Sequence, residues 1–126
     1  MITFRKLTLV AHVRYYTSNC EAGKGAGGVF SIEFDEFGDA VDYFAVCEGT
    51  SRNCGGGKTP WDTWISCEED KDRGLVYECD PSGERAHQLT YMVPKGGRYE
   101  SAAFYTDDKR NLVAFTTHDH ERGALV

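Results

Sequence analysis

The sequence predicts an all-β protein, organised as a partial β-propeller of about two to three antiparallel blades. Apolar residues recur at every second position, as in the segment from Val29 to Phe34, and this period is typical of strands rather than helices. Short runs rich in Asp and Gly separate the apolar runs and have the chemistry of hairpin turns. An internal repeat with a period of about 40–50 residues then indicates propeller blades.

Strands are expected at the apolar runs and alternations, with approximate ranges 2–14, 28–34, 41–47, 63–68, 75–79, 86–92, 100–105 and 112–117. The turn at residues 35–38 separates the second and third of these runs. The turn at residues 80–83 separates the fifth and sixth, and the turn at residues 107–111 separates the last two. No amphipathic helix pattern is left over, so the turns are expected to close hairpins.

Two pairs of segments carry the repeat. Residues 28–38 resemble residues 74–83, and residues 69–75 resemble residues 118–124, with similar offsets. Chance similarity of short Gly/Asp turns is the alternative explanation. A closed propeller has about four to eight blades, and a chain of 126 residues supplies fewer than three repeats. We therefore expect the chain to need further blades or self-association to close.

Composition excludes several classes of function. With 20 acidic and 14 basic residues the net charge is -6, which disfavours binding to nucleic acid. No segment reaches the roughly 20 apolar residues of a membrane-spanning helix, and the chain as written has no recognisable signal peptide. Its 5 cysteines lack the C-x-x-C spacing, so neither a disulfide scaffold nor a zinc ribbon is indicated.

Chemistry-bearing residues gather between Gly49 and Asp70. The glycines at 55–57 are expected to adopt positive φ and to place the thiol of Cys54 at a tight turn that closely approaches a ligand. Trp61 and Trp64 are expected either to wall this turn or to pack in a blade core.

Two familiar motifs are absent. A nucleotide-binding loop is excluded because Arg52 stands where that motif needs glycine. A standard EF-hand over residues 68–79 is excluded because Cys79 stands where the bidentate glutamate belongs. The dense carboxylates are either a site for a hard cation of different geometry or a solvated acidic turn.

Residues 49–57 read GTSRNCGGG and are followed by TPW at 59–61 and TWISCEE at 63–69. This run resembles the signature of the PhoX-type alkaline phosphatases, approximately GTxRNCAGGxTPWGTWLSCEE. The resemblance extends through GLVYECDP at 74–81 and GRYESAAF at 97–104, so that about residues 27–125 are covered. It implies a partial PhoX-like propeller over residues 27–126 and leaves residues 1–26 unassigned.

The family hydrolyses phosphate esters on a β-propeller that holds iron and calcium ions. The resemblance implies that Cys54 is a thiolate ligand and that Cys54 and Asn53 belong to the catalytic centre. Glu69 and Glu100 match carboxylate ligands, and Glu68 is a further candidate ligand. Iron and calcium are thus the implied cofactors, and a phosphate ester the implied substrate. Anionic sulfur and oxygen donors suit ferric iron, so the acidic composition becomes a supply of ligands.

Several positions depart from the family pattern. Tyr99 and Ser101 flank Glu100 where relatives have His and Ala, and Asp62 replaces a glycine. The T-E-D motif appears as Thr-His-Asp at residues 117–119. The chain also lacks the family's C-terminal blades, which supply further ligands and phosphate contacts. We therefore expect little or no phosphatase activity from this chain by itself.

Other interpretations stay open at the level of sequence. His118 and His120 would face one side of a strand and could share a metal with Asp119, or form an ordinary polar turn. Cys54 could pair with Cys67 in a disulfide. The alternative function is a noncatalytic propeller segment that binds calcium or a partner protein. The family is commonly exported, but the localisation of this chain is not predicted.

Overall fold

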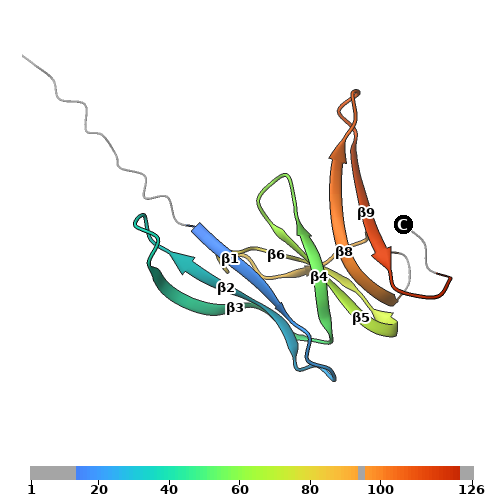
Figure 1. Ribbon diagram of the computed structural model, residues 1–126, viewed down its shortest axis with the longest axis horizontal. Helices are drawn as coiled ribbons and strands as arrows, with labels where there is room; N and C mark the ends of the chain where they lie inside the picture. The colour runs from blue at the N-terminus through green and yellow to red at the C-terminus, as the bar shows by residue number, and fades with distance from the viewer. Residues whose placement is uncertain (1–13, 94–95, 123–126) are drawn as a thin grey trace, which may run out of the picture.

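The computed structural model describes residues 14–93 and 96–122 (Figure 1). These residues form two antiparallel sheets and contain no helix, which confirms the predicted all-β class. It follows that no helix within the described ranges could cross a membrane. The two sheets do not close into a barrel over these residues, and the number of blades stays a prediction.

The first sheet has the order β1-β2-β3, with β1 at Arg14–Cys20, β2 at Gly27–Phe34 and β3 at Ala40–Thr50. It lies on the left of Figure 1. The β1–β2 pairing runs without a register shift from Arg14 opposite Phe34 to Cys20 opposite Gly28. Strand β1 thus belongs to the sheet, although the resemblance left residues 1–26 unassigned and the strand expected here ended at residue 14. The rest of the strand expected at 2–14 lies outside the described residues.

The second sheet has the order β7-β6-β5-β8-β9, and β4 pairs with β5 off this path. Its strands are β4 (Asn53–Lys58), β5 (Trp64–Gly74), β6 (Val76–Cys79), β7 (Gln88–Leu89), β8 (Gly97–Thr106) and β9 (Leu112–His118). The long strand β5 serves two sets of partners. Its first half pairs with β4 and β6, and its second half pairs with β8, where Glu69 lies opposite Arg98.

Two apolar clusters hold the strands together. One is built from β5, β6 and β8 and their flanks, with Ile65, Cys67, Val76, Val93, Tyr99 and Ala102 buried. The other joins the two sheets and buries Val29, Val46, Cys47 and Cys79. The predicted alternation explains this division, since Trp64 of β5 packs on the second cluster while its neighbour Ile65 enters the first. All five cysteines are free, and three of them fill core positions.

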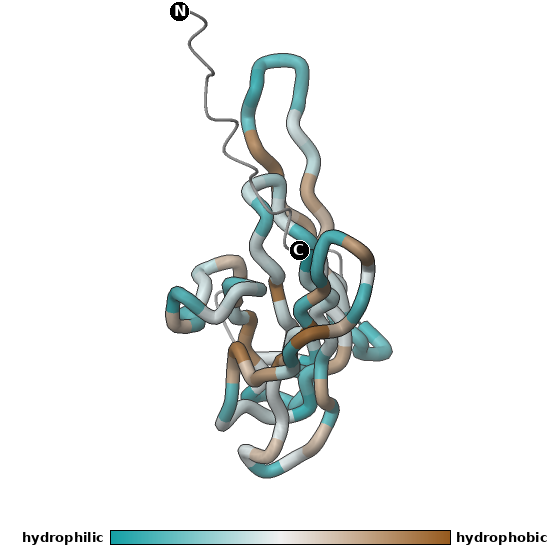
Figure 2. Tube along the Cα trace, turned by 90° about the vertical axis from the view of Figure 1, so that its left-hand side faces the viewer, coloured by the Kyte–Doolittle hydropathy of each residue, from teal (hydrophilic) through white to brown (hydrophobic). Residues whose placement is uncertain are grey.

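The three predicted turns are confirmed as the connections β2–β3, β6–β7 and β8–β9. In the first, the carboxylate of Asp35 accepts hydrogen bonds from the backbone of Phe37 and Asp39, both at 2.9 Å. Gly38 completes that turn with a φ of 91°. The β8–β9 turn is the hydrophilic tip at the top of Figure 2. The strand expected at 86–92 is reduced to the two residues of β7.

The three consecutive glycines do not form the expected turn with positive φ. They lie in strand β4, and none of them is among the glycines of positive φ. Their function is to let backbones approach closely. A Cβ atom on Gly55 would overlap the carbonyl oxygen of Glu100, and one on Gly57 would overlap that of Ala102. Strand β4 can therefore lie against β8 only if these positions have no side chain.

We predict that Gly55→Ala destabilises the protein by roughly 1–3 kcal/mol, because the added methyl group meets a backbone carbonyl that cannot rotate away. Urea unfolding of the full chain measures the change. Gly23→Ala is the matched control, since its Cβ would meet only the side chain of Arg52, at 3.8 Å. Equal stabilities for the two variants would contradict the close approach of β4 and β8.

Candidate metal centre

Cys54 is the second residue of β4, and its backbone is held from two sides. The side-chain amide of Asn19 on β1 donates to the carbonyl oxygens of Cys54 at 3.1 Å and of Gly55 at 2.7 Å. Arg52, the residue just before β4, has a φ of 52°, and its carbonyl oxygen accepts from the backbone N–H of Glu69 at 2.9 Å. This last bond ties the start of β4 to the acidic half of β5.

Asn53 is completely buried next to Cys54. Its Oδ1 accepts from the hydroxyl of Thr50 at 2.6 Å, and its Nδ2 donates to the hydroxyl of Ser66 at 2.9 Å. Both ends of the amide are thus used inside the protein. This arrangement fixes the backbone from which the Cys54 side chain emerges.

The Cys54 sulfur lies in a group of three potential ligands with Glu21 and Glu69, whose ligand atoms are all within 4.8 Å of one another. The thiol and the Glu69 carboxylate are partly buried, and the Glu21 carboxylate is exposed. Glu21 directly follows β1, so three separate segments of the chain supply this group.

A second group of three contains Glu69, Glu100 and Asp119, again with all ligand atoms within 4.8 Å of one another. Glu100 is on β8, and Asp119 directly follows β9, where its backbone N–H donates to the carbonyl of Arg98 at 2.8 Å. The two groups share Glu69. We call the five residues Glu21, Cys54, Glu69, Glu100 and Asp119 the acidic cluster.

The electrostatics of the acidic cluster favour a cation. Within the described ranges, no ion pair involves any of its four carboxylates. Burial and the nearby carboxylates, in the order Glu21, Glu100, Glu69 and Asp119, raise the pKa of the Cys54 thiol above its usual value. Without a cation the thiol therefore keeps its proton at neutral pH.

Glu68, the further candidate from the sequence, lies outside both groups. It is 6% exposed, and its carboxylate accepts backbone hydrogen bonds from Ser51 at 2.7 Å and from Leu75 at 2.9 Å. These contacts tie the β3–β4 connection and the start of β6 to β5. In the structure, the Glu68 carboxylate thus accepts the hydrogen bonds of two backbone N–H groups.

Glu21 was not predicted as a metal ligand, and Asp119 was considered only as a ligand shared with His118 and His120, not with Glu69 and Glu100. Asp119 matches the last residue of the family's T-E-D motif, so the sequence did contain a pattern that could have identified it as a carboxylate ligand. Glu21 lies in the segment that resembled nothing, and contacts of β1 with β2 and with the start of β4 bring it to Cys54. His118 and His120 stack on each other, with ring centroids 5.8 Å apart, and belong to neither group.

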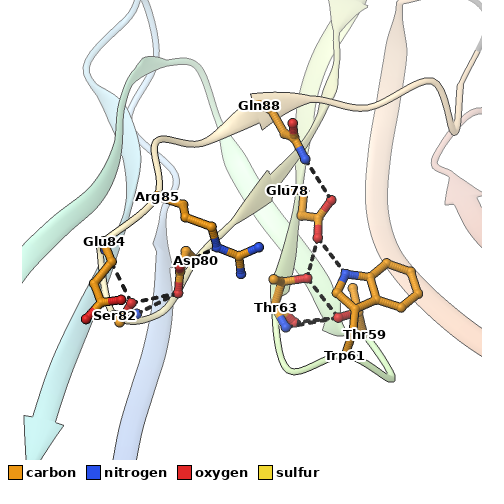
Figure 3. Close-up of polar contacts among 9 residues, drawn as sticks. All are labelled: Thr59, Trp61, Thr63, Glu78, Asp80, Ser82, Glu84, Arg85 and Gln88. Atoms are coloured by element: carbon orange, nitrogen blue, oxygen red, sulfur yellow. Dashed lines mark hydrogen bonds and ion pairs between the residues drawn. The ribbon is translucent and has the colours of Figure 1, made fainter.

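The TPWDTW half of the signature forms a hydrogen-bonded turn between β4 and β5 (Figure 3). The hydroxyls of Thr59 and Thr63 lie 2.8 Å apart. One carboxylate oxygen of Glu78 on β6 accepts from the indole of Trp61 and from the hydroxyl of Thr63, each at 2.6 Å. Burial by itself would raise the pKa of the Glu78 carboxyl. These two hydrogen bonds and a third from Gln88 outweigh burial and hold the pKa of Glu78 below its usual value.

A cavity of about 760 Å³ lies between β1 and this turn, lined by residues such as Arg14, Tyr16, Lys58 and Trp64. No residue of the acidic cluster lines it. It is therefore separate from the candidate metal centre.

Comparison with known proteins supports the similarity on which the ligand assignment depends. The model of the family described as "Alkaline phosphatase PhoX" matches residues 26–89, just over half of the chain. No curated protein and no solved structure matches. The matched range includes Glu68, Glu69 and Cys54 but ends before Glu100 and Asp119.

We predict that Thr63→Val destabilises the protein by about 1–2 kcal/mol at pH 7, because a partly buried hydrogen bond to a carboxylate is lost. The lowered pKa of Glu78 contributes stability above pH 4.5, its unperturbed value, and this contribution is lost as the pH falls through the folded-state pKa. We measure the free energy of unfolding of Thr63→Val and of the parent in urea, at pH 7 and in the acid range. The difference between the two proteins should be smaller in acid. Thr106→Val, at an exposed position, is the control.

We further predict slow alkylation of Cys54 in the metal-free protein, with half-maximal rate above pH 9.0, because its thiol pKa is raised. Peptide-resolved mass spectrometry after iodoacetamide treatment measures the rate at each pH. Glu21→Gln removes a negative charge and should accelerate the reaction severalfold at pH 8. A half-maximal rate well below pH 9.0 in the parent would contradict this electrostatic description.

Proposed function

Because the chain belongs to the PhoX alkaline phosphatase family, we propose that it carries part of a metal-dependent site for phosphomonoester hydrolysis. Cys54, Glu69 and Glu100 are the proposed metal ligands. The observation that supports this most is the position of Glu69, which is shared between a group containing the thiol and a group of three carboxylates.

The donor set fits the metals that the family implies. A thiolate with carboxylates suits ferric iron, and carboxylate oxygens suit calcium. Four carboxylates that have no cationic partner among the described residues repel one another, and a bound cation relieves this repulsion. Glu21 and Asp119 are therefore proposed as additional ligands from the chain itself.

Bound cations would neutralise the phosphoryl oxygens of the substrate and lower the pKa of a coordinated water. The protein's residues prepare this site in separate ways. Cys54 must lose its proton to bind, so metal binding is coupled to proton release and weakens as the pH falls. Asn53 and Glu68 are proposed as positioning residues, because their polar atoms hold the backbone on either side of the ligands.

The five residues of the acidic cluster lie around β4, β5 and β8, in sheets that do not close over the described residues. We propose that these sheets are part of a propeller and that further strands, from other blades or from a second copy, complete the site. The substrate class is a phosphate ester. A noncatalytic segment that binds calcium through the same carboxylates is the second candidate function, and the exposure of Glu21 and Asp119 favours it.

We predict that the full chain binds iron and that Cys54→Ser and Glu69→Gln each reduce the bound iron at least about tenfold, since each removes a charged donor. Elemental analysis after removal of excess metal measures stoichiometry, and visible absorption from an iron–thiolate bond reports on Cys54 directly. Glu36→Gln, in the exposed β2–β3 turn, is the matched control.

Weak binding of calcium alone, with no iron retained, would instead support the noncatalytic candidate. In the same preparations, we expect little or no turnover of a generic phosphomonoester by the chain alone. Metal-dependent turnover that is lost in Cys54→Ser would show that no strands from outside this sequence are needed.

A further inference from the structure

A second site adjoins the acidic cluster and has the opposite charge. A cavity of about 280 Å³ is lined by Lys71, Arg98, His118 and His120, together with Asp72 and Gly96. It gathers two permanent cations and two imidazoles around a single carboxylate, in a chain whose net charge is -6. We call this the basic cavity.

The strands place the two sites side by side. On β5, Glu69 belongs to the acidic cluster and Lys71 lines the basic cavity. On β8, Glu100 belongs to the acidic cluster and Arg98 lines the basic cavity. At the end of β9, Asp119 enters the cluster, and the histidines on either side of it line the cavity. Each of these three segments therefore supplies an acidic residue to the acidic cluster and a basic residue to the basic cavity, and the two residues are no more than two positions apart in the sequence.

The basic groups are available to a ligand. Over the described ranges, neither Lys71 nor Arg98 is in an ion pair. The carbonyl of Arg98 accepts from Asp119, which fixes the backbone under the guanidinium. His120 Nδ1 accepts from the backbone N–H of Arg122 at 3.1 Å, so the neutral ring carries its proton on Nε2 and can donate it.

Two backbone segments meet at the wall of the cavity, at Gly96 and Asp72. A Cβ atom on Gly96 would overlap the carbonyl oxygen of Asp72, so these two segments touch without side chains between them. His118 is held by its contacts with the rings of Tyr99, at 5.4 Å, and His120, at 5.8 Å. The cavity is thus lined by donors on packed segments.

We propose that the basic cavity binds a tetrahedral oxyanion of the phosphate type. The guanidinium of Arg98 offers paired donors that match two oxygens of such an anion, Lys71 supplies a point charge, and the imidazoles supply further N–H donors. A volume of about 280 Å³ also leaves room for water or for an organic group attached to the anion. This inference does not depend on a metal in the acidic cluster.

The test is a calorimetric titration of inorganic phosphate into the full chain, in a chelator-treated buffer at fixed pH and ionic strength. We expect saturable binding that Arg98→Gln and Lys71→Gln each weaken about tenfold or more, as expected for loss of a charged hydrogen bond. Lys109→Gln, which removes an equal charge at the exposed β8–β9 tip, should leave the affinity unchanged. Thermal melts establish that each variant is folded.

Two results would overturn the proposal: no saturable binding of phosphate by the parent, or equal weakening by Lys109→Gln and Arg98→Gln, which would indicate attraction by overall charge only. Cys54→Ser separates this proposal from the proposed function. It should strongly reduce iron binding, as predicted above, and leave phosphate binding intact, so the failure of either site is visible by itself.

Discussion

The close approach of β4 to β8 is the constraint on which the candidate metal centre depends. Gly55 lies against the carbonyl of Glu100, and Gly57 against that of Ala102, with no space for a Cβ atom. Because these backbones touch, the thiol of Cys54 at the start of β4 and the carboxylate of Glu100 on β8 both reach Glu69 of β5. Larger residues at the glycines would separate the strands and disperse the donors.

Strand β5 connects the remaining parts. It exchanges one set of neighbours for another near Glu69, where pairing with β4 and β6 ends and pairing with β8 begins. A strand that changes partners brings side chains from several segments to one place, and here they form an acidic site and a neighbouring basic site. Separation of opposite charges by one or two residues creates two neighbouring sites that differ in the ligand they favour.

The long signature divides into a chemical half and a structural half. Cys54 and Glu69 point into the acidic cluster, whereas Asn53 and Glu68 beside them are buried and bonded to the surrounding chain. The Thr-Pro-Trp turn is anchored to Glu78 on β6. Adjacent residues thus have different tasks because successive side chains on a strand face opposite ways.

Local chemistry determined part of this molecule. The alternation of apolar residues sufficed for the all-β class, and an aspartate with a nearby glycine or asparagine sufficed for the turns at Asp35 and Asp107, because such preferences act within a few residues. The motif around Cys54 likewise identified the family. Only the tertiary structure decided that three glycines form a strand, that Glu21 joins Cys54, and that Lys71 and Arg98 share a cavity. Each of these depends on contacts between residues distant in sequence, which no local pattern records.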